Sequence, residues 1–258
     1  MFFKQFPKID YDFNRTGVVQ KMVDLYRSVR PLPSFLDEYS GYKFYTIKNG
    51  ERPDIVSGRL YGTSRYYWTF FLLNDHLHDG YRAWPMSQEA LQDYMAKEYR
   101  GFAIETSPKA TDGPDGPFEN SLSGRFTLGE TVVGGSSNAS GTVTKKIVDL
   151  SQLIVQDTTG TFTAPELITG QTSSNSVSSN RVYNYIDAPY YYYKVGDALK
   201  HPVTNADHIT GGVNNSQTEF VSNRAYLEGQ NDSNATIRYV EPAFINKFTK
   251  SFKELLNR

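Results

Sequence analysis

The sequence predicts an α+β protein in which a small all-β module, a barrel or a sandwich, interrupts an aromatic main body. Eleven tyrosines lie within residues 11–99 and eight within residues 183–239, but none lies within residues 100–182. In that gap, 28 of the 60 residues from 121 to 180 are Ser, Thr or Gly, interrupted by short β-branched runs. Such a composition is typical of short strands joined by turns, whereas the flanking segments show helical spacing.

Turn-forming residues mark the expected boundary of this insert. The segment 110–118, Ala-Thr-Asp-Gly-Pro-Asp-Gly-Pro-Phe, is dense in Gly, Pro and Asp, which favour turns and loops. We therefore expect an N-terminal region over residues 1–111, the Ser/Thr/Gly-rich all-β insert over 112–182, and a return to the main body over 183–258.

The insert contains a short internal repeat. Phe126-Thr-Leu-Gly-Glu-Thr-Val-Val-Gly134 recurs as Phe162-Thr-Ala-Pro-Glu-Leu-Ile-Thr-Gly170, and each copy precedes a stretch that contains Ser-Ser-Asn. Each copy would supply a turn, a short strand and a second turn. The repeat predicts two related hairpins that close a small barrel or sandwich, although chance reuse of turn residues is the alternative.

Charge and composition exclude several classes of protein. The chain has 27 Lys and Arg against 28 Asp and Glu and no cysteine. Nucleic-acid binding depends on clustered basic residues, so we expect no nucleic-acid partner. Without cysteine there is no disulfide and no thiolate metal site. No apolar run approaches the length of a signal peptide core or a membrane span, so the sequence predicts a soluble, unexported protein without a membrane partner.

The N-terminal part predicts a strand, two helices and a return strand. Residues 42–47 alternate as a strand does, and Lys48-Asn-Gly-Glu51 is a turn. Asp54 is expected to cap a helix that begins at Ile55 and stops at Gly62. A second helix, capped by Thr63 or Ser64, would bury Tyr67, Phe70, Phe71 and Leu73. The return strand is expected around residues 81–84.

These residues resemble the LysM domain. The pattern Y-x-I-x-x-G-E, a short helix ending in Y-G, then Y-W and a closing N-D, runs from Tyr45 to Asp75, which places a LysM-like βααβ unit at about residues 42–85. In carbohydrate-binding members the groove lies between two loops. The resemblance implies a candidate groove formed by Gly50, Glu51, Asp54, Asn74, Asp75 and His76. The alternative is that the aromatic residues pack a small core and touch no sugar.

A wider resemblance extends to the baseplate wedge protein family of contractile-tailed bacteriophages, a small wedge subunit with an embedded LysM-like fold. The resemblance extends over about 150 residues, and five segments within it carry the match. They are Met1–Phe6, Arg52–Asp75, Trp84–Ala90, Tyr193–Asp197 and Arg238–Leu256. The Ser/Thr/Gly-rich insert departs from the family pattern. The resemblance implies a virion location in the tail baseplate, assembly in the host cytoplasm, and other wedge and hub-proximal tail proteins as partners in a hexagonal assembly.

Three flanking features are candidates for packing within the chain or for contact with partners. A helix after Ser87 would place Ala90, Leu91, Tyr94 and Met95 on one face. Pro242 suits the first turn of a C-terminal amphipathic helix, whose stripe docks either on the chain's own core or on a partner. The run 190–193 is four consecutive tyrosines, and in a strand alternate residues face opposite sides, two inward and two outward. The candidate interface residues are Tyr190, Tyr191, Tyr192, Tyr193, Phe244, Phe248 and Phe252.

The sequence contains few candidates for catalytic or metal-binding residues. His76 and His78 could present two imidazoles on one side of an extended segment, but solvated loop histidines are the simpler interpretation. No H-E-x-x-H, G-x-S-x-G, P-loop or G-x-G-x-x-G motif is present. A glycosidase pair would need two carboxylates at a set separation in space, which sequence spacing does not determine. We expect no catalytic residue, no metal and no cofactor.

Three functions of different classes remain. The favoured one is a non-enzymatic structural subunit that joins baseplate wedge proteins and helps to close a hexagonal ring. The alternative is a LysM-type protein that binds peptidoglycan or another carbohydrate. A cell-wall-degrading enzyme is the third.

Overall fold

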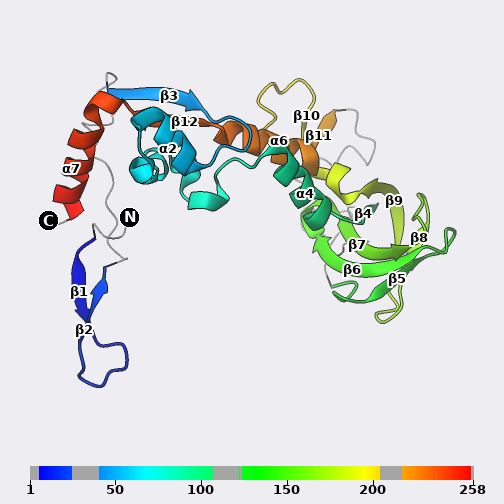
Figure 1. The fold of residues 1–258 in the computed structure, drawn as a ribbon. Coiled ribbons are helices and arrows are strands. Elements are labelled where there is room, and N and C mark those ends of the chain that lie inside the picture. Colours follow the sequence, from blue (N-terminus) through cyan, green and yellow to red (C-terminus); the bar gives the residue numbers. More distant parts are fainter. Residues whose placement is uncertain (1–5, 25–40, 107–121, 123, 204–216, 257–258) are drawn as a thin grey trace. The chain divides into compact units, whose positions relative to one another are not determined.

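The computed structural model describes all residues except 1–5, 25–40, 107–121, 123, 204–216 and 257–258 (Figure 1). The chain divides into two compact units. The body unit comprises residues 1–89 and 230–258, and the barrel unit comprises residues 90–229. The mixed content of helices and strands confirms the predicted α+β class. None of the helices in the described part is both long and apolar enough to span a bilayer.

The body unit is built on a two-stranded antiparallel sheet whose strands come from distant parts of the sequence. Strand β3 (Tyr42–Thr46) pairs with β12 (Thr236–Val240), and the register sets Tyr45 opposite Ile237 (Figure 1). The return strand predicted around residues 81–84 is wrong, because residues 80–82 form the short 3-10 helix η5 (Gly80–Arg82). Gly80 has a φ of +64°, a left-handed conformation that interrupts an extended strand.

Two helices follow β3 and bury aromatic side chains against the sheet. Helix α2 (Pro53–Tyr61) is followed by the 3-10 helix η3 (Ser64–Tyr66) and by α3 (Trp68–Leu73). The 3-10 helix η4 (Asp75–Leu77) comes next. The buried residues of this cluster, which we call the sheet core, are Ile47, Val56, Phe70, Leu77, Trp84 and Ile237.

The ends of α2 follow local chemistry. Its N-cap is Arg52 with Pro53 in the first turn, where the missing N–H of proline costs nothing. Asp54 lies inside the first turn, so the prediction that it caps a helix starting at Ile55 is wrong. At the other end Gly62 has a φ of 72° and donates its N–H to the carbonyl of Gly58 at 2.9 Å, which confirms the predicted stop.

A second cluster joins α3 to the C-terminal segment. After the 3-10 helix η8 (Pro242–Phe244), helix α7 spans Ile245–Leu256. Its buried face packs on Trp68, Leu73 and Val240. The residues of that face are Ile245, Phe248, Phe252 and Leu256. We call this cluster the terminal core.

An N-terminal hairpin completes the body unit. Strands β1 (Lys8–Tyr11) and β2 (Gln20–Val23) are antiparallel, and the N–H of Asp24 donates to the carbonyl of Pro7 at 2.9 Å. Phe6, just before the hairpin, packs against the terminal core.

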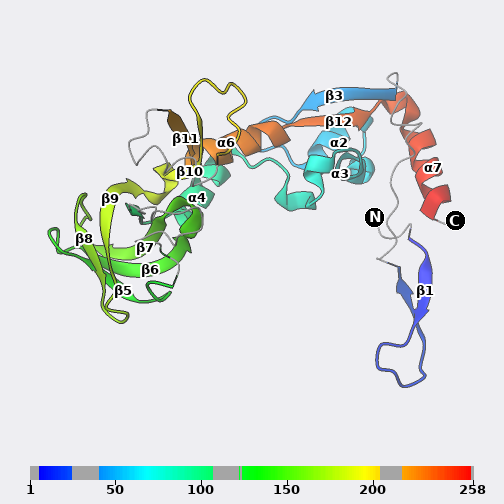
Figure 2. The same ribbon diagram turned by 180° about the vertical axis from the view of Figure 1, so that it is seen from behind.

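The barrel unit contains a closed six-stranded antiparallel barrel with strand order β4-β7-β6-β5-β8-β9 (Figure 2). The barrel predicted as one of two all-β alternatives is therefore confirmed. Its strands are β4 (Phe102–Thr106), β5 (Thr131–Gly134), β6 (Ser140–Ile147), β7 (Gln152–Thr159), β8 (Leu167–Gly170) and β9 (Ser176–Asn184). Strand β4 precedes the predicted insert 112–182 yet pairs with β7 and β9, so the barrel extends beyond that range.

The interior of the barrel is apolar and includes the phenylalanine of each repeat copy. Phe126 and Phe162 are 4% and 2% exposed, and both belong to the barrel core. The other buried residues of this core are Ile104, Leu122, Val132, Ala139, Val143, Leu153, Val155, Ile168 and Val177.

The two repeat copies are related by a local two-fold axis. Position 166 follows position 130 by 36 residues, and in the antiparallel β5–β8 pair Val133 lies opposite Thr169, its own equivalent at that offset. Backbone hydrogen bonds repeat in the same way: Gly135 N–H donates to Leu167 at 2.8 Å, and Gln171 N–H donates to Thr131 at 2.9 Å. The repeat in the sequence is therefore a repeat in the structure.

Each repeat glutamate holds the loop of the other copy. The Glu166 carboxylate accepts hydrogen bonds from the backbone N–H of Ser137 at 3.0 Å and from the Ser137 hydroxyl at 2.8 Å. Glu130 accepts from the N–H of Ser173 at 2.9 Å and from its hydroxyl at 3.0 Å. Structurally Ser137 corresponds to Ser173, so the two Ser-Ser-Asn triplets are out of step by one residue.

The repeat glycines leave room for these carboxylates. A Cβ on Gly170 would lie 2.6 Å from the Ser173 hydroxyl and 2.7 Å from Glu130 Oε2, and a Cβ on Gly134 would lie 2.5 Å from Glu166 Oε2. Neither glycine has a positive φ. The motif therefore requires glycine for space rather than for backbone conformation.

Further elements, lying wholly or mostly in the barrel unit, are found outside the six barrel strands. They are α4 (Gln88–Glu98), η6 (Val148–Leu150), η7 (Tyr185–Asp187), β10 (Pro189–Lys194), β11 (Thr218–Ser222) and α6 (Asn223–Asn234). Helix α4 confirms the helix predicted after Ser87. Of the four residues expected on its packing face, Leu91 and Met95 are buried, whereas Ala90 and Tyr94 are exposed. Asn223 fixes the start of α6, because its side-chain amide donates to the carbonyls of Tyr185 and Ala188 at 2.8 and 3.1 Å.

Acid should weaken the barrel. Burial alone would raise the pKa values of Glu130 and Glu166, but the N–H and O–H donors outweigh it and hold both pKa values below the usual range. Because the folded-state pKa is the lower one, this contribution to stability is complete above the unfolded-state pKa near 4.5 and is lost as the pH falls through the folded-state value. We expect Glu166→Gln to lower the free energy of unfolding of the barrel by about 1–3 kcal/mol at pH 7. Calorimetry from pH 7 to pH 3 should show this difference shrinking. Glu228→Gln, at an exposed position of α6, is the control. An equal loss of stability in that variant would contradict the stabilising role of the Glu166 hydrogen bonds.

Two glycine substitutions should act in opposite directions. Gly170→Ala places a methyl group against the Glu130 carboxylate and should destabilise the barrel by about 2 kcal/mol. Gly58→Ala lies in the interior of α2 with nothing within 4 Å of the added Cβ, and it should stabilise the body unit by up to about 1 kcal/mol. Thermal unfolding by calorimetry measures both. A harmless Gly170→Ala would show that the loop adjusts at little cost.

Candidate partner interface and groove

Glu51 of the candidate groove is used inside the body unit. Its carboxylate accepts hydrogen bonds from the Tyr45 hydroxyl at 2.8 Å and from the N–H of Lys48 at 2.9 Å, and it pairs with Arg59. Burial acts to raise its pKa, but these donors and Arg59 lower it below the usual range. The backbone carbonyl of Glu51 accepts the indole N–H of Trp84 at 2.7 Å. The turn is thus tied to the sheet core, and Arg59 and Trp84 are its unpredicted partners.

Asn74 is also committed to the fold. Its amide donates to the carbonyls of Phe70 at 2.8 Å and Arg238 at 2.9 Å, and its side-chain oxygen accepts the N–H of Arg238 at 2.8 Å. These three bonds join the end of α3 to β12. Asn74 is buried, and its position in the motif is explained without a ligand.

The other groove residues are more accessible. Gly50 has a φ of +73° in the turn after β3. Asp54 pairs with Arg52 at 3.2 Å; the Arg52 side chain is largely exposed and that of Asp54 is half-buried. Asp75 and His76 are exposed in η4, and partial burial lowers the pKa of His76. The structure therefore leaves Asp54, Asp75 and His76 as polar groups that a ligand could meet, while Glu51 and Asn74 are occupied.

The three predicted interface phenylalanines differ in exposure. Phe248 and Phe252 are each 4% exposed, and the Phe252 ring lies 4.9 Å from that of Trp68. Phe244 is 38% exposed. Phe248 and Phe252 therefore fill the chain's own terminal core, and of the three only Phe244 is accessible in this structure.

The tyrosine run does not alternate as predicted. Tyr192 and Tyr193 are both buried, whereas Tyr190 is exposed and Tyr191 is half-buried. Consecutive residues face opposite sides of a strand, so both faces of β10 are covered at this point. The Tyr192 hydroxyl donates to Glu105 of β4 at 3.2 Å, and the Tyr193 hydroxyl donates to Glu219 of β11 at 2.7 Å.

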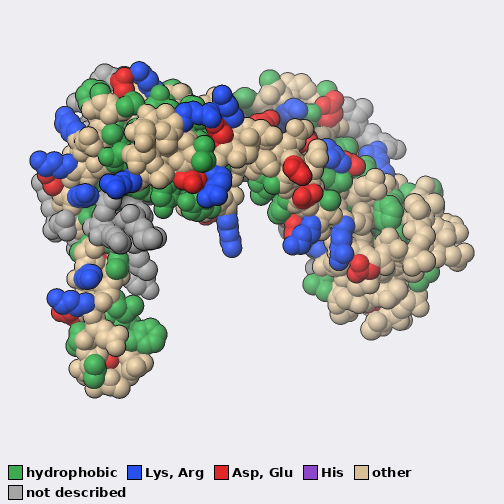
Figure 3. Space-filling view, in the orientation of Figure 1, with side chains coloured by type: hydrophobic (Ala, Val, Ile, Leu, Met, Phe, Trp, Pro, Cys, Tyr) green, Lys and Arg blue, Asp and Glu red, His purple; other side chains and the backbone are tan. Residues whose placement is uncertain are grey.

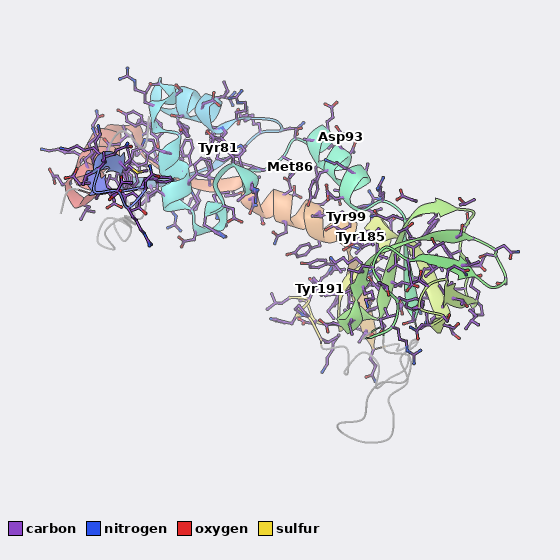
Figure 4. All side chains as sticks on the ribbon, turned by 90° about the horizontal axis from the view of Figure 1, so that it is seen from below. Tyr81, Met86, Asp93, Tyr99, Tyr185 and Tyr191 are labelled. Carbon is purple, nitrogen blue, oxygen red and sulfur yellow. The ribbon has the colours of Figure 1, made fainter. Side chains whose placement is uncertain are left out.

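The accessible tyrosines of the run lie at its beginning. The Tyr190 ring stacks on Tyr226 of α6 with centroids 3.7 Å apart. The hydrogen bond to Tyr226 raises the pKa of Tyr190 to about 12. A bulge between Pro189 and Tyr191 changes the register with β11, and Figure 4 shows Tyr191 on this ribbon. Tyr190 and Tyr191 are the two residues of the run that could meet a partner.

A pocket that sequence reasoning missed lies in the barrel unit, with a volume of about 360 Å³. Tyr99 and Tyr185 are in contact beside it with ring centroids 4.9 Å apart (Figure 4). Arg100 and Arg224 lie on its wall, but Arg224 already donates to Asp187 at 2.9 Å. Its lining is Gln92, Met95, Ala96, Tyr99, Arg100, Gly101, Asn184, Ile186 and Arg224. No spacing rule connects residues from these three segments, so the sequence holds no signal for it.

The histidines do not gather into a metal site in the described part of the chain, where no three His, Asp or Glu side chains are close enough to hold an ion. His78 pairs with Asp79 at 3.2 Å, and His201 pairs with Asp197 at 2.9 Å. Both are exposed pairs on the surface.

Comparison with known proteins bears on the body unit. Residues 1–105 match the model of the family described as base plate wedge protein 53. This match supports a structural role in a phage tail baseplate and with it a virion location. It covers β1 to β4, and the rest of the barrel lies outside it. No curated protein matches the chain.

Removing a phenylalanine ring from α7 should show whether the helix belongs to the fold. We expect Phe252→Ala to lower the free energy of unfolding by about 3–5 kcal/mol, because it leaves a cavity against Trp68. Phe244→Ala, on the accessible side, is the matched control and should cost less than about 1 kcal/mol. Both tryptophans of the chain, Trp68 and Trp84, lie in the body unit, so urea unfolding followed by tryptophan fluorescence reports on it. Unchanged stability in Phe252→Ala would mean that the stripe serves a partner instead.

Proposed function

We propose that this chain is a structural, non-enzymatic subunit of a phage contractile-tail baseplate that joins wedge proteins and helps to close a hexagonal ring. The match of residues 1–105 to a baseplate wedge family carries this proposal. In a closed ring each contact must repeat with its symmetry mates, so the chain would act through fixed geometry and interface area. Assembly with wedge and hub-proximal proteins would take place in the host cytoplasm.

The body unit would provide the docking surface. Its arrangement of two strands and two helices is firmly held, because the polar groups of Glu51 and Asn74 bond internally. Several large apolar side chains stay exposed on it, among them Phe44 at 71% and Tyr81 at 65%. Arg238 lies 5.8 Å from the Phe44 ring, and aromatic and arginine side chains are enriched among residues that dominate interface energy.

The barrel would be an appendage of this docking body. The N–H of Tyr185 donates to the carbonyl of Gly101 at 2.9 Å, so the chain enters and leaves the barrel at adjacent points. A module with neighbouring ends can be added to a fold without displacing its core.

Co-expression with the wedge proteins encoded beside it in its own genome tests the function. Mass photometry should find a discrete heteromeric complex, while the chain alone stays monomeric. A persistent monomer would contradict the proposal, and retention on purified cell wall would then favour the carbohydrate-binding alternative.

Replacing Phe102–Asn184 by a short Gly-Ser linker between Gly101 and Tyr185 should leave wedge binding within about threefold of the full chain. The residues needed for docking would all lie in the body unit. Unchanged tryptophan fluorescence would show that the body unit remains folded. Loss of binding with an intact body unit would show that the barrel is itself an interface.

A further inference from the structure

The β1–β2 hairpin presents an apolar face to solvent. Ile9 and Met22 are directly opposite each other, so they share a face, and Tyr11 follows Ile9 by two residues on the same side. The ring of Phe13 meets that of Tyr11 edge-on with centroids 6.5 Å apart. These four residues, which we call the hairpin face, are 40%, 41%, 50% and 72% exposed in the order Ile9, Met22, Tyr11 and Phe13. Figure 3 shows hydrophobic side chains on the surface of this hairpin.

The opposite face of the ribbon is largely polar. Asp10 lies opposite Lys21, and Lys8 lies opposite Val23. The hairpin is therefore amphipathic. Such an alternation of apolar and polar residues is normally seen when one side of a sheet is packed against another layer and the other side faces solvent.

The hairpin is well defined at its tip and its base. The Asp12 carboxylate accepts hydrogen bonds from the N–H groups of Thr16 at 3.1 Å and Gly17 at 2.6 Å. At the base, Phe6 packs on the terminal core. Yet a two-stranded hairpin is marginally stable in water, and a third layer is usually needed to cover its apolar side. The described residues of this chain leave that side open.

The charge of the hairpin favours a protein surface, rather than a lipid or nucleic acid, as the partner that covers the hairpin face. The described hairpin segment, residues 6–24, carries three basic residues and three acidic residues, so it has no net charge. It therefore lacks the net positive charge that anionic lipid or nucleic acid attracts. Apolar residues run along the strands, as Ile9, Tyr11 and Met22 show. They continue into the connecting loop, where Val18 and Val19 are also exposed, so the apolar surface extends along the whole ribbon and fits a ribbon laid flat on a partner.

The exposed area indicates one part of a larger contact. Tyr11 and Phe13 together leave about 250 Å² of side chain uncovered. A contiguous apolar patch of a few hundred Å² commonly marks an interaction site, but a stable interface needs about 800 Å² from each partner. The hairpin face would therefore act together with other parts of the body unit.

We infer that the hairpin face docks onto an apolar, uncharged surface of another baseplate protein and adds a layer to it, with Phe13 and Tyr11 as the anchoring side chains. This inference rests on the proposed function, because it names the surface through which the chain joins its partner.

The test compares substitutions on the two faces of the ribbon. The full chain is co-expressed with its wedge neighbours, and affinity is measured by biolayer interferometry on the purified components. We expect Phe13→Ser and Tyr11→Ser each to weaken binding at least tenfold. Lys8→Ser and Lys21→Ser, on the polar face, are the matched controls and should change affinity less than twofold. Tryptophan fluorescence and the thermal midpoint should be unchanged in all four, because Trp68 and Trp84 report on the body unit.

The outcomes separate the two proposals. If the unaltered chain forms a complex and Phe13→Ser binds equally well, the hairpin inference is overturned and the proposed function stands. If the unaltered chain forms no complex, both fail. Flotation with vesicles of anionic phospholipid, or dimerisation of the chain alone that Phe13→Ser abolishes, would also overturn the inference, because a membrane or a second copy would then cover the face.

Discussion

The pairing of β3 with β12 is the constraint on which the body unit depends. A single strand at residues 42–46 pairs with none of the described segments next to it in the sequence, and the backbone groups along its edge need a partner. The partner arrives from residues 236–240, and it brings Val240 and α7 with it. Through this one pairing Ile237 reaches the sheet core and Phe252 reaches Trp68, so both aromatic clusters are completed by the same C-terminal segment. Asn74 locks the arrangement by bonding the backbone of Arg238 on one side and Phe70 on the other.

Local features of the sequence predicted local structure well. Gly62 ends α2 because only a residue that tolerates a left-handed backbone suits that position. The apolar spacing after Pro242 matches the buried face of α7, and the repeated glutamates lie at equivalent points of a closed barrel. In each case the deciding interaction lies within a few residues or within a repeat, so the pattern in the sequence contains it.

Contacts between residues distant in the sequence could not be predicted in the same way. The strand expected near Trp84 is replaced by β12 because pairing partners 190 residues apart leave no spacing pattern. The tyrosine run buries two consecutive rings because β10 is covered on both sides, by the barrel at Tyr192 and by the Lys200 loop at Tyr193. Of the candidate site residues, Glu51 and Asn74 turned out to be bonded inside the fold, a distinction that requires knowledge of Trp84 and Arg238.

The separation of β3 and β12 along the chain has a consequence for synthesis on the ribosome. All six barrel strands lie between them, and the pairings that close the barrel join only strands within residues 102–184. The barrel can therefore fold while the body unit still lacks β12 and α7, which reverses the usual N-to-C order of folding during translation. An unfinished polypeptide would carry a folded barrel but an open body, with Trp68 and Phe70 uncovered. Completion of the body unit thus reports that translation has passed residue 256, and a particle assembled through this unit would exclude truncated copies.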